Sequence, residues 1–217
     1  QGFDYGTDGG GNRYVLWYTY TEDGTPTWYQ AAAPEPVGNV WKARLKRFTN
    51  DGASQQRVVV GWVSLTALSE DDYIYSFTLF GEDGSDEIFN PFYPPDCPLE
   101  GQAKQSYNGV WSTDPIGIGG ATVVVNTDSE GYVHYIYDAD GNPVWLQGSA
   151  NMRQWSGFCP VCTGPTPTRT PVGPFNRLLT DETNMSWTLD YSLLAPLHGT
   201  VNRTDVTQKI TARIECQ

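Results

Sequence analysis

Two histidines, His134 and His198, are the only side chains in this 217-residue chain that could serve as the base of a Ser-His-Asp triad. His134 lies in an aromatic stretch with strand character, and His198 lies in A-P-L-H-G-T, which is typical of a turn. The chain contains no G-x-S-x-G, no H-E-x-x-H, no phosphate-binding glycine loop and no C-x-x-C-H. We therefore expect structural or surface roles for both histidines, no enzymatic activity and no cofactor.

Acidic residues are the next candidates, because paired carboxylates hydrolyse glycosides and acidic loops bind calcium. Here they gather in short polar stretches that are typical of turns, at residues 70–72, 82–87 and 138–140. The segment starting at Asp138 resembles the start of a calcium loop, but serine stands at its twelfth position instead of glutamate. We expect solvated turn residues and no metal site, and a glycan hydrolase that uses turn carboxylates stays open as a third reading.

Four cysteines permit three disulfide pairings, and the spacing does not choose among them. We favour a short clip between Cys159 and Cys162 and a long staple between Cys97 and Cys216. A redox motif needs a helix after C-P-V-C, whereas T-G-P-T-P-T-R-T-P follows, and a four-thiolate zinc site has only one C-x-x-C. Disulfides indicate an oxidising compartment, so we expect a secreted or cell-surface protein.

The net charge of −12 narrows the choice of partners. Such acidity repels phosphate backbones, and with no basic cluster expected to offset it, nucleic acid and anionic membranes are poor partners. No run of eighteen apolar residues could span a bilayer. The chain begins at Gln1 without a leader, which we interpret as a mature product of export.

Eight tryptophans and thirteen tyrosines suit stacking on sugar rings. Trp28 and Trp145 recur at equivalent places in the sequence and therefore look like core residues. Trp17, Trp41 and Trp155 have no aromatic counterpart, which makes them the candidates for an exposed ligand contact. A carbohydrate-binding module is accordingly the alternative function.

One aromatic-flanked phrase occurs twice: W-Y-T-Y-T-E-D-G-T-P-T-W-Y at residues 17–29 and H-Y-I-Y-D-A-D-G-N-P-V-W-L at residues 134–146. A D-G pair between β-prone runs predicts a hairpin, because both loop positions tolerate positive φ. We expect two-residue loops, formed by Asp23 and Gly24 in the first copy and by Asp140 and Gly141 in the second. This loop length places Tyr18 opposite Tyr29.

The repetition extends along the chain and predicts the domain organisation. The hairpins are 117 residues apart, and V-V-G-W-V-S-L-T-A-L matches P-V-G-P-F-N-R-L-L-T at an offset of 112. The proline-rich segment P-P-D-C-P separates the two copies. We predict an all-β protein of two tandem antiparallel β-sandwich or small-barrel modules related by internal duplication, at residues 1–95 and 96–217.

The start of the second copy has no partner in the first. Residues 107–118, which include a predicted strand around Trp111, project to positions before residue 1. We therefore expect the first module to lack the opening strand of the repeat and to carry an open edge or groove.

With both copies aligned, the chain resembles a group of bacterial exported proteins built from repeated β modules. Their pattern is G-x-W-x-D-P…G-x-G, then W-x-x-Y-D-x-D-G-x-P-x-W, then V-G-x-x-x-L, with an F-C-P-V-C clip like that of residues 158–162. The matching residues here are Gly109, Trp111, Asp114, Pro115, Gly117, Gly119, Tyr137, Asp138, Asp140, Gly141, Pro143, Trp145, Val172 and Gly173. The resemblance implies a fold of turns and core aromatics and no established reaction or ligand, and His134 departs from it by replacing a tryptophan.

Together these features favour a non-enzymatic secreted structural or interaction protein. A strand from another copy could complete the first module by β-augmentation, and head-to-tail repetition of that contact would build a filament. The alternative partner is an extracellular polysaccharide bound by exposed aromatic rings.

Overall fold

The computed structural model of this protein describes residues 1–7, 10–69, 72–89, 109–113, 119–125, 130–158, 166–181 and 183–212. These residues form two antiparallel sheets and no helix, which confirms the all-β prediction of two antiparallel units. Among them there is accordingly no helix with the length and hydropathy needed to cross a membrane. The predicted boundary between residues 95 and 96 lies outside the described residues.

The first sheet is a seven-stranded half-barrel whose strands follow the order of the chain. Its strands are β1 (Gly2–Thr7), β2 (Asn12–Tyr20), β3 (Pro26–Pro34), β4 (Val40–Asn50), β5 (Gln55–Ala67), β6 (Asp72–Leu79) and β7 (Glu82–Phe89).

The second sheet is a closed ring, in which β8 pairs with β9 on one side and with β15 on the other. Its strands are β8 (Gly109–Thr113), β9 (Gly120–Val125), β10 (Glu130–Tyr137), β11 (Pro143–Gly148), β12 (Asn151–Ser156), β13 (Thr168–Leu179), β14 (Asn184–Ser192) and β15 (Thr200–Ala212). The described strands of the first sheet include no counterpart of β8 between β1 and β7.

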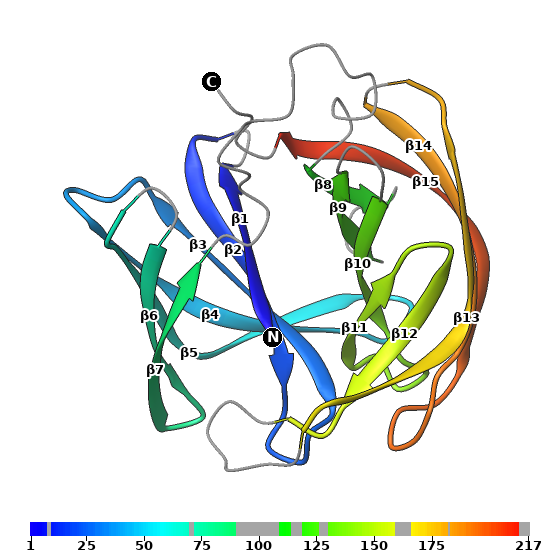
Figure 1. Ribbon diagram of the computed structural model, residues 1–217, viewed down its shortest axis with the longest axis horizontal. Coiled ribbons are helices and arrows are strands. Elements are labelled where there is room, and N and C mark those ends of the chain that lie inside the picture. The colour runs from blue at the N-terminus through cyan, green and yellow to red at the C-terminus, as the bar shows by residue number, and fades with distance from the viewer. Residues whose placement is uncertain are drawn as a thin grey trace.

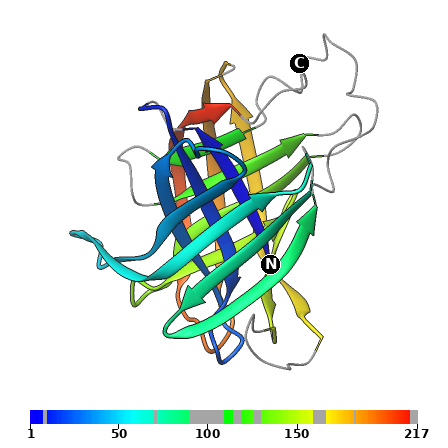
Figure 2. The ribbon, with the colours of Figure 1, turned by 90° about the vertical axis from the view of Figure 1, so that its left-hand side faces the viewer.

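The first sheet and the ring lie side by side, as Figure 1 shows, with the hairpins β2–β3 and β10–β11 between them. Figure 2 turns the first sheet toward the viewer, where it forms a curved layer in front of the ring. Each unit has its own apolar core: one around Trp17 and Leu45 inside the first sheet, the other around Trp187 and Met152 inside the ring. A third apolar cluster, which includes Trp28, fills the space between them.

The third cluster explains why the central strands read as nearly continuous apolar runs. Residues 14–17 of β2 and 132–136 of β10 are buried at every position. Successive side chains of a strand point to opposite faces, so such a run requires cover on both faces. One face of these strands meets its own core, and the other meets the neighbouring sheet.

The pairing registers relate the two units strand by strand. Tyr18 pairs with Trp28, and the residues 117 positions later, Tyr135 and Trp145, pair in the same way. Both sheets also have a β-bulge in an equivalent strand pair: in β4–β5 the register shifts between Leu45 and Lys46, and in β12–β13 it shifts between Met152 and Arg153. Equivalent bulges at equivalent places support a common design for the two copies.

The V-G match at an offset of 112 corresponds to a tight backbone approach. A Cβ atom on Gly61 would lie 1.8 Å from the carbonyl oxygen of Thr78, and one on Gly173 would lie 1.8 Å from that of Asp190. Both glycines sit where the bulged strand crosses close to the next strand. Only a residue without a side chain fits there, which is the physical reason for the repeated glycine.

The hairpin loops differ from the prediction by one residue. Thr21 N–H donates to the Thr25 carbonyl at 2.8 Å and Gly24 N–H to the Thr21 carbonyl at 3.0 Å, so the loop has three residues. Tyr18 consequently pairs with Trp28 instead of Tyr29. The two-residue prediction is wrong because the aspartate does not take positive φ; only Gly24, at 82°, does.

The second D-G hairpin has the same three-residue geometry. Asp138 N–H donates to the Asn142 carbonyl at 3.0 Å, and Gly141 N–H to the Asp138 carbonyl at 3.1 Å. Gly141 has a φ of 79°, whereas Asp140 is not among the residues with positive φ. A three-residue loop with glycine in the left-handed position is a common hairpin connection.

The two units contact each other reciprocally. The Trp28 ring packs against Tyr135 with centroids 5.9 Å apart, and the Trp145 ring packs against Tyr18 at 5.3 Å. Tyr135 and Trp145 are the repeat equivalents of Tyr18 and Trp28, so exchanging the two repeats turns one contact into the other. This is the pattern of an isologous two-fold interface, here formed within one chain.

Backbone hydrogen bonds at the loop tips repeat the same symmetry. Gly157 N–H donates to the Gly24 carbonyl at 3.1 Å, and Asn50 N–H donates to the Gly141 carbonyl at 3.0 Å. The tip of the β4–β5 hairpin thus reaches the β10–β11 loop, and the end of β12 reaches the β2–β3 loop. The repeated D-G hairpins are therefore the elements that join the two units.

Candidate functional site

The two D-G loops line one cleft. It has a volume of about 550 Å³ and lies where both loops meet the connection between β14 and β15. The pseudo-two-fold contact places the loops at the same end of the molecule, which is why residues 117 positions apart share one cavity. Carboxylates from Glu22, Asp23, Asp138 and Asp140 contribute to the lining, with Arg47 and His198 as the basic side chains.

Two of these four carboxylates, those of Asp23 and Asp138, hold their own loops in place. Asp138 Oδ1 accepts the backbone N–H of Asp140 at 3.0 Å and that of Asn142 at 2.8 Å. In the first copy, the Thr25 N–H donates to Asp23 Oδ1 at 3.2 Å. The Thr21 hydroxyl also donates to Asp23, and this bond lowers the pKa of the Asp23 carboxyl below its usual value. Such side-chain bonds to the local backbone are the usual role of aspartate in turns.

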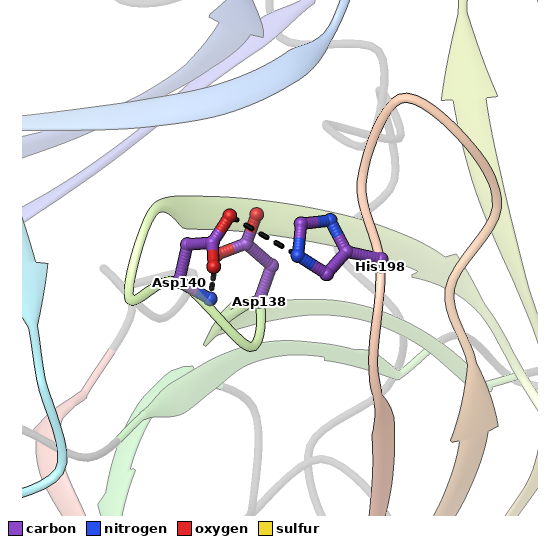
Figure 3. Close-up of side chains that lie close together, drawn as sticks. All are labelled: Asp138, Asp140 and His198. Atoms are coloured by element: carbon purple, nitrogen blue, oxygen red, sulfur yellow. Dashed lines mark hydrogen bonds and ion pairs between the residues drawn. The ribbon is translucent and has the colours of Figure 1, made fainter.

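Asp138, Asp140 and His198 form the one cluster of three metal-ligating groups found among the described residues. Figure 3 shows the His198 ring, from the β14–β15 connection, directed at the Asp140 carboxylate. His198 Nε2 lies 3.1 Å from Asp140 Oδ2, and ligand atoms of all three residues lie within 4.8 Å of one another. Two carboxylates and an imidazole could hold a divalent cation such as Zn²⁺.

The same cluster has a complete structural explanation. The Ala139 N–H donates to the His198 carbonyl at 3.0 Å, which fixes the two loops together. Asp138 caps its own loop, and the side chains of Asp140 and His198 are about 60% exposed, at 62% and 61%. An exposed histidine–aspartate contact beside a capped turn needs no ligand to account for it.

Arg47 connects the cleft walls. Its Nη2 donates to Asn142 Oδ1 at 3.0 Å, so a β4 side chain of the first sheet holds the loop of the second repeat. Together with the loop-tip hydrogen bonds, this contact makes the cleft part of the joint between the two units. We assign it a structural role.

The tryptophans expected at the surface lie elsewhere. Trp17 is fully buried and Trp41 is 4% exposed, both in the core of the first sheet. Trp155 is half-buried and stacks on Trp145 at 6.3 Å, in the place where Phe48 stacks on Trp28 at 5.8 Å. The exposure prediction is wrong for Trp17 and Trp41, because both side chains lie on the face of their strands that lines the first sheet's own core.

Sequence reasoning missed Trp62, which is 41% exposed on the outer face of β5. Lys42 Nζ lies 5.4 Å and Arg44 Cζ lies 5.2 Å from the centroid of its rings, so cation–π contacts hold it. The segment W-V-S-L at residues 62–65 contained the signal, since inward Val63 and Leu65 require Trp62 to point outward.

The basic residues beside Trp62 also correct the expectation of no basic cluster. Four of the thirteen basic residues lie in the six-residue stretch K-A-R-L-K-R at residues 42–47 of β4. Lys42 and Arg44 are exposed on the same face as Trp62, whereas Lys46 and Arg47 are half-buried. A local patch of positive charge therefore interrupts the acidic surface.

His134 is fully buried inside the ring, in the position that Trp17 holds in the first sheet. Its ring lies 4.6 Å from the Phe175 ring and 5.0 Å from the Trp187 rings. Burial, with a smaller effect from the charge of Arg203, lowers the pKa of His134 to about 3. The imidazole of His134 is therefore a neutral ring that packs in the core of the ring of strands.

The four cysteines, Cys97, Cys159, Cys162 and Cys216, all lie outside the described residues. Both disulfide pairings therefore stay predictions, as does the oxidising compartment inferred from them.

Comparison with protein-family models, with curated proteins and with solved structures found no match. The resemblance to exported bacterial repeat proteins thus remains a proposal that rests on the motifs quoted above.

Proposed function

We propose that this protein is a non-enzymatic, exported interaction protein whose first sheet accepts a strand from a second copy of the chain. The observation that carries the proposal is the difference between the two units. The ring is closed by β8, whereas the first sheet ends at β1 and β7 with no described strand between them. Export is part of the proposal and rests on the four cysteines.

The ring supplies the template for such a strand. In it, residues 109–112 of β8 pair with β9, and β8 pairs with β15 only from Thr207 onward. Matching the registers of the two copies, Thr207 corresponds to Ile88, at the end of β7. The incoming strand would therefore lie along β1 and meet only the last residues of β7.

The rest of the β7 edge is built to resist pairing. Glu82, Asp83, Asp86 and Glu87 are all exposed along this strand. Charged side chains on an edge strand discourage unspecific strand addition. Acceptance of a strand would thus be confined to the short stretch that β8 occupies in the ring.

The geometry favours an open assembly over a closed dimer. The isologous face of each repeat is already used inside the chain, where Trp28 packs against Tyr135 and Trp145 packs against Tyr18. A contact between a donated strand and the first sheet of the next copy joins two different surfaces, and contacts of that kind continue head to tail.

Electron microscopy and sedimentation over a concentration series test this function. We expect elongated particles whose mass rises with concentration. A peptide of residues 107–113, Y-N-G-V-W-S-T, should bind the protein and shorten the particles. The same peptide with Trp111→Pro is the control, because proline cannot donate a ladder hydrogen bond. The proposal would be contradicted if the protein stayed monomeric at every concentration and did not bind the peptide.

A further inference from the structure

The open end of the first sheet contains a second cavity, of about 320 Å³. Its walls come from five strands of the sheet and include Tyr5, Tyr14, Trp41, Leu65 and Tyr73, with Arg13 beside them. Tyr14, Trp41 and Leu65 are each at least 91% buried, so the walls belong to the folded core. Pockets at the mouths of barrels, lined by aromatic residues and a few polar groups, are common ligand sites.

Two tyrosines bring β1 and β6 together at this cavity. The hydroxyl oxygens of Tyr5 and Tyr73 lie 3.3 Å apart, and their ring centroids are 6.0 Å apart at 61°. Trp41 Nε1 donates to the Ala33 carbonyl at 3.4 Å, which fixes the indole within the wall. The cavity therefore combines aromatic surfaces with phenolic hydroxyls that can donate and accept hydrogen bonds.

The charge beside the cavity is balanced. Arg13 Nε lies 2.5 Å from Glu35 Oε2, and the Arg13 guanidinium also lies 6.0 Å from the centroid of the Tyr5 ring. A guanidinium has five N–H donors, so it can serve a ligand oxygen as well as Glu35. The carboxylate of Glu35 would repel an anionic ligand, and the pair together favours a neutral one.

Among the described residues, the second copy has no counterpart of the tyrosine pair formed by Tyr5 and Tyr73. Matching the registers, Tyr5 corresponds to Val123 and Tyr73 corresponds to Met185. Val123 and Met185 are both buried in the apolar core of the closed ring. At these two positions the repeat thus has aliphatic side chains in one copy and a pair of phenolic rings beside a cavity in the other.

We propose that this cavity binds one neutral pyranose ring, as a free sugar or as a unit of a polysaccharide. A pyranose has an apolar face for the aromatic walls and hydroxyl groups for the phenols and the guanidinium. The cavity lies at the small end of the range for ligand pockets, which suits a single ring. The inference is independent of strand exchange, since it uses the interior of the sheet.

Saturation-transfer NMR on the whole chain tests the site with three kinds of probe: the neutral methyl glycosides of glucose, galactose and mannose, then galacturonate, then phenol. We expect signal from at least one neutral glycoside, and at most a weak one from the other two probes. Binding of phenol or galacturonate alone, or of no probe at all, would overturn the proposal.

Substitutions on β5 and β6 locate the site. Ala67 lines the cavity, and Ala67→Leu should fill it and weaken glycoside binding at least about tenfold, or about 1.4 kcal/mol. Thr66→Leu is the matched control, because Thr66 lies between the inward residues Leu65 and Ala67 and faces outward. Tyr73→Phe, which keeps the ring and loses the hydroxyl, should weaken binding several-fold. Undiminished binding by a folded Ala67→Leu protein would place the sugar elsewhere, for example on exposed Trp62.

Discussion

Trp28 and Trp145 each donate an indole N–H to a backbone carbonyl in the other repeat. Trp28 Nε1 lies 3.3 Å from the Ile136 oxygen, and Trp145 Nε1 lies 2.6 Å from the Thr19 oxygen. Ile136 follows Thr19 by the same 117 positions that separate the two tryptophans, so the bonds form a symmetric pair. The repeated W of the D-G-x-P-x-W phrase is therefore the anchor by which each copy holds the other.

Removing either indole N–H should destabilise the protein by a similar amount. Trp28→Phe and Trp145→Phe each lose a buried hydrogen bond and leave a small void, for a loss of about 2 kcal/mol in the free energy of unfolding. Urea denaturation followed by circular dichroism measures this loss. Trp62→Phe is the control, since its exposed ring should cost less than about 1 kcal/mol. Equal stability of all three variants would mean that the reciprocal bonds contribute nothing.

The bulge glycines should not tolerate a methyl group. Gly173→Ala places a Cβ 1.8 Å from the Asp190 carbonyl oxygen at a φ of 146°, and we expect a loss of about 3 kcal/mol or more. Gly131→Ala is the matched control, because the nearest atom to its Cβ lies 4.0 Å away. Thermal unfolding should separate the two variants, and a Gly173→Ala protein as stable as Gly131→Ala would refute the close approach.

Buried His134 should make the protein less stable in acid. The pKa of His134 is lowered from 6.5 to about 3 in the folded state, so between those pH values the unfolded chain binds a proton that the folded chain does not. The free energy of unfolding therefore falls as pH falls through this window, by an amount on the order of 4 kcal/mol. Urea midpoints between pH 7 and pH 4 report this slope.

Replacing the imidazole isolates its share of the acid effect. His134→Phe keeps a ring of similar size, and His134→Trp installs the residue found at the equivalent Trp17. In either variant the free energy of unfolding should fall less steeply with falling pH than in the parent. Carboxylates that titrate in the same range affect the parent and the variants alike. Parallel slopes in the parent and in both variants would show that His134 does not titrate in this way.

Phe80 should be a strained residue whose replacement stabilises the fold. It has a φ of 53° in the two-residue turn that closes the Leu79–Glu82 pair, and its side chain is 63% exposed. Phe80→Asn creates the Asn-Gly sequence that such turns prefer, and we expect a gain of about 1 kcal/mol. Differential scanning calorimetry tests this, with a higher melting temperature expected. A lower one would mean that the Phe80 contact with Tyr29, at 6.3 Å between centroids, outweighs the strain.

The D-G hairpins show how far the sequence reaches and where it stops. Their existence follows from local chemistry, because Asp and Gly between β-prone runs favour a turn. Their register depends on one further residue, since Thr21 and Asp138 bond across the loop and turn a two-residue loop into a three-residue one. A shift of one residue moves each cross-strand partner, which is why Tyr18 meets Trp28.

The candidate sites show the same division. The strand around His134 and the turn around His198 are predictable from neighbouring residues, and the two lie in β10 and between β14 and β15. The exposed position predicted for Trp41 is wrong, because Trp41 lines an internal cavity. Trp62 was overlooked although its neighbours alternate clearly. Alternation places residues on opposite faces of a strand, but it does not say which of the two faces will line the interior of the sheet.

By itself, the sequence determined that this chain folds into two duplicated antiparallel units, because hairpin chemistry and a period of two act over a few neighbouring residues. Only the tertiary structure decided that each repeated tryptophan contacts the other unit, that one unit closes into a ring, and that the other keeps an aromatic cavity. Those outcomes depend on contacts between residues about a hundred positions apart, and such contacts leave no local pattern in the chain.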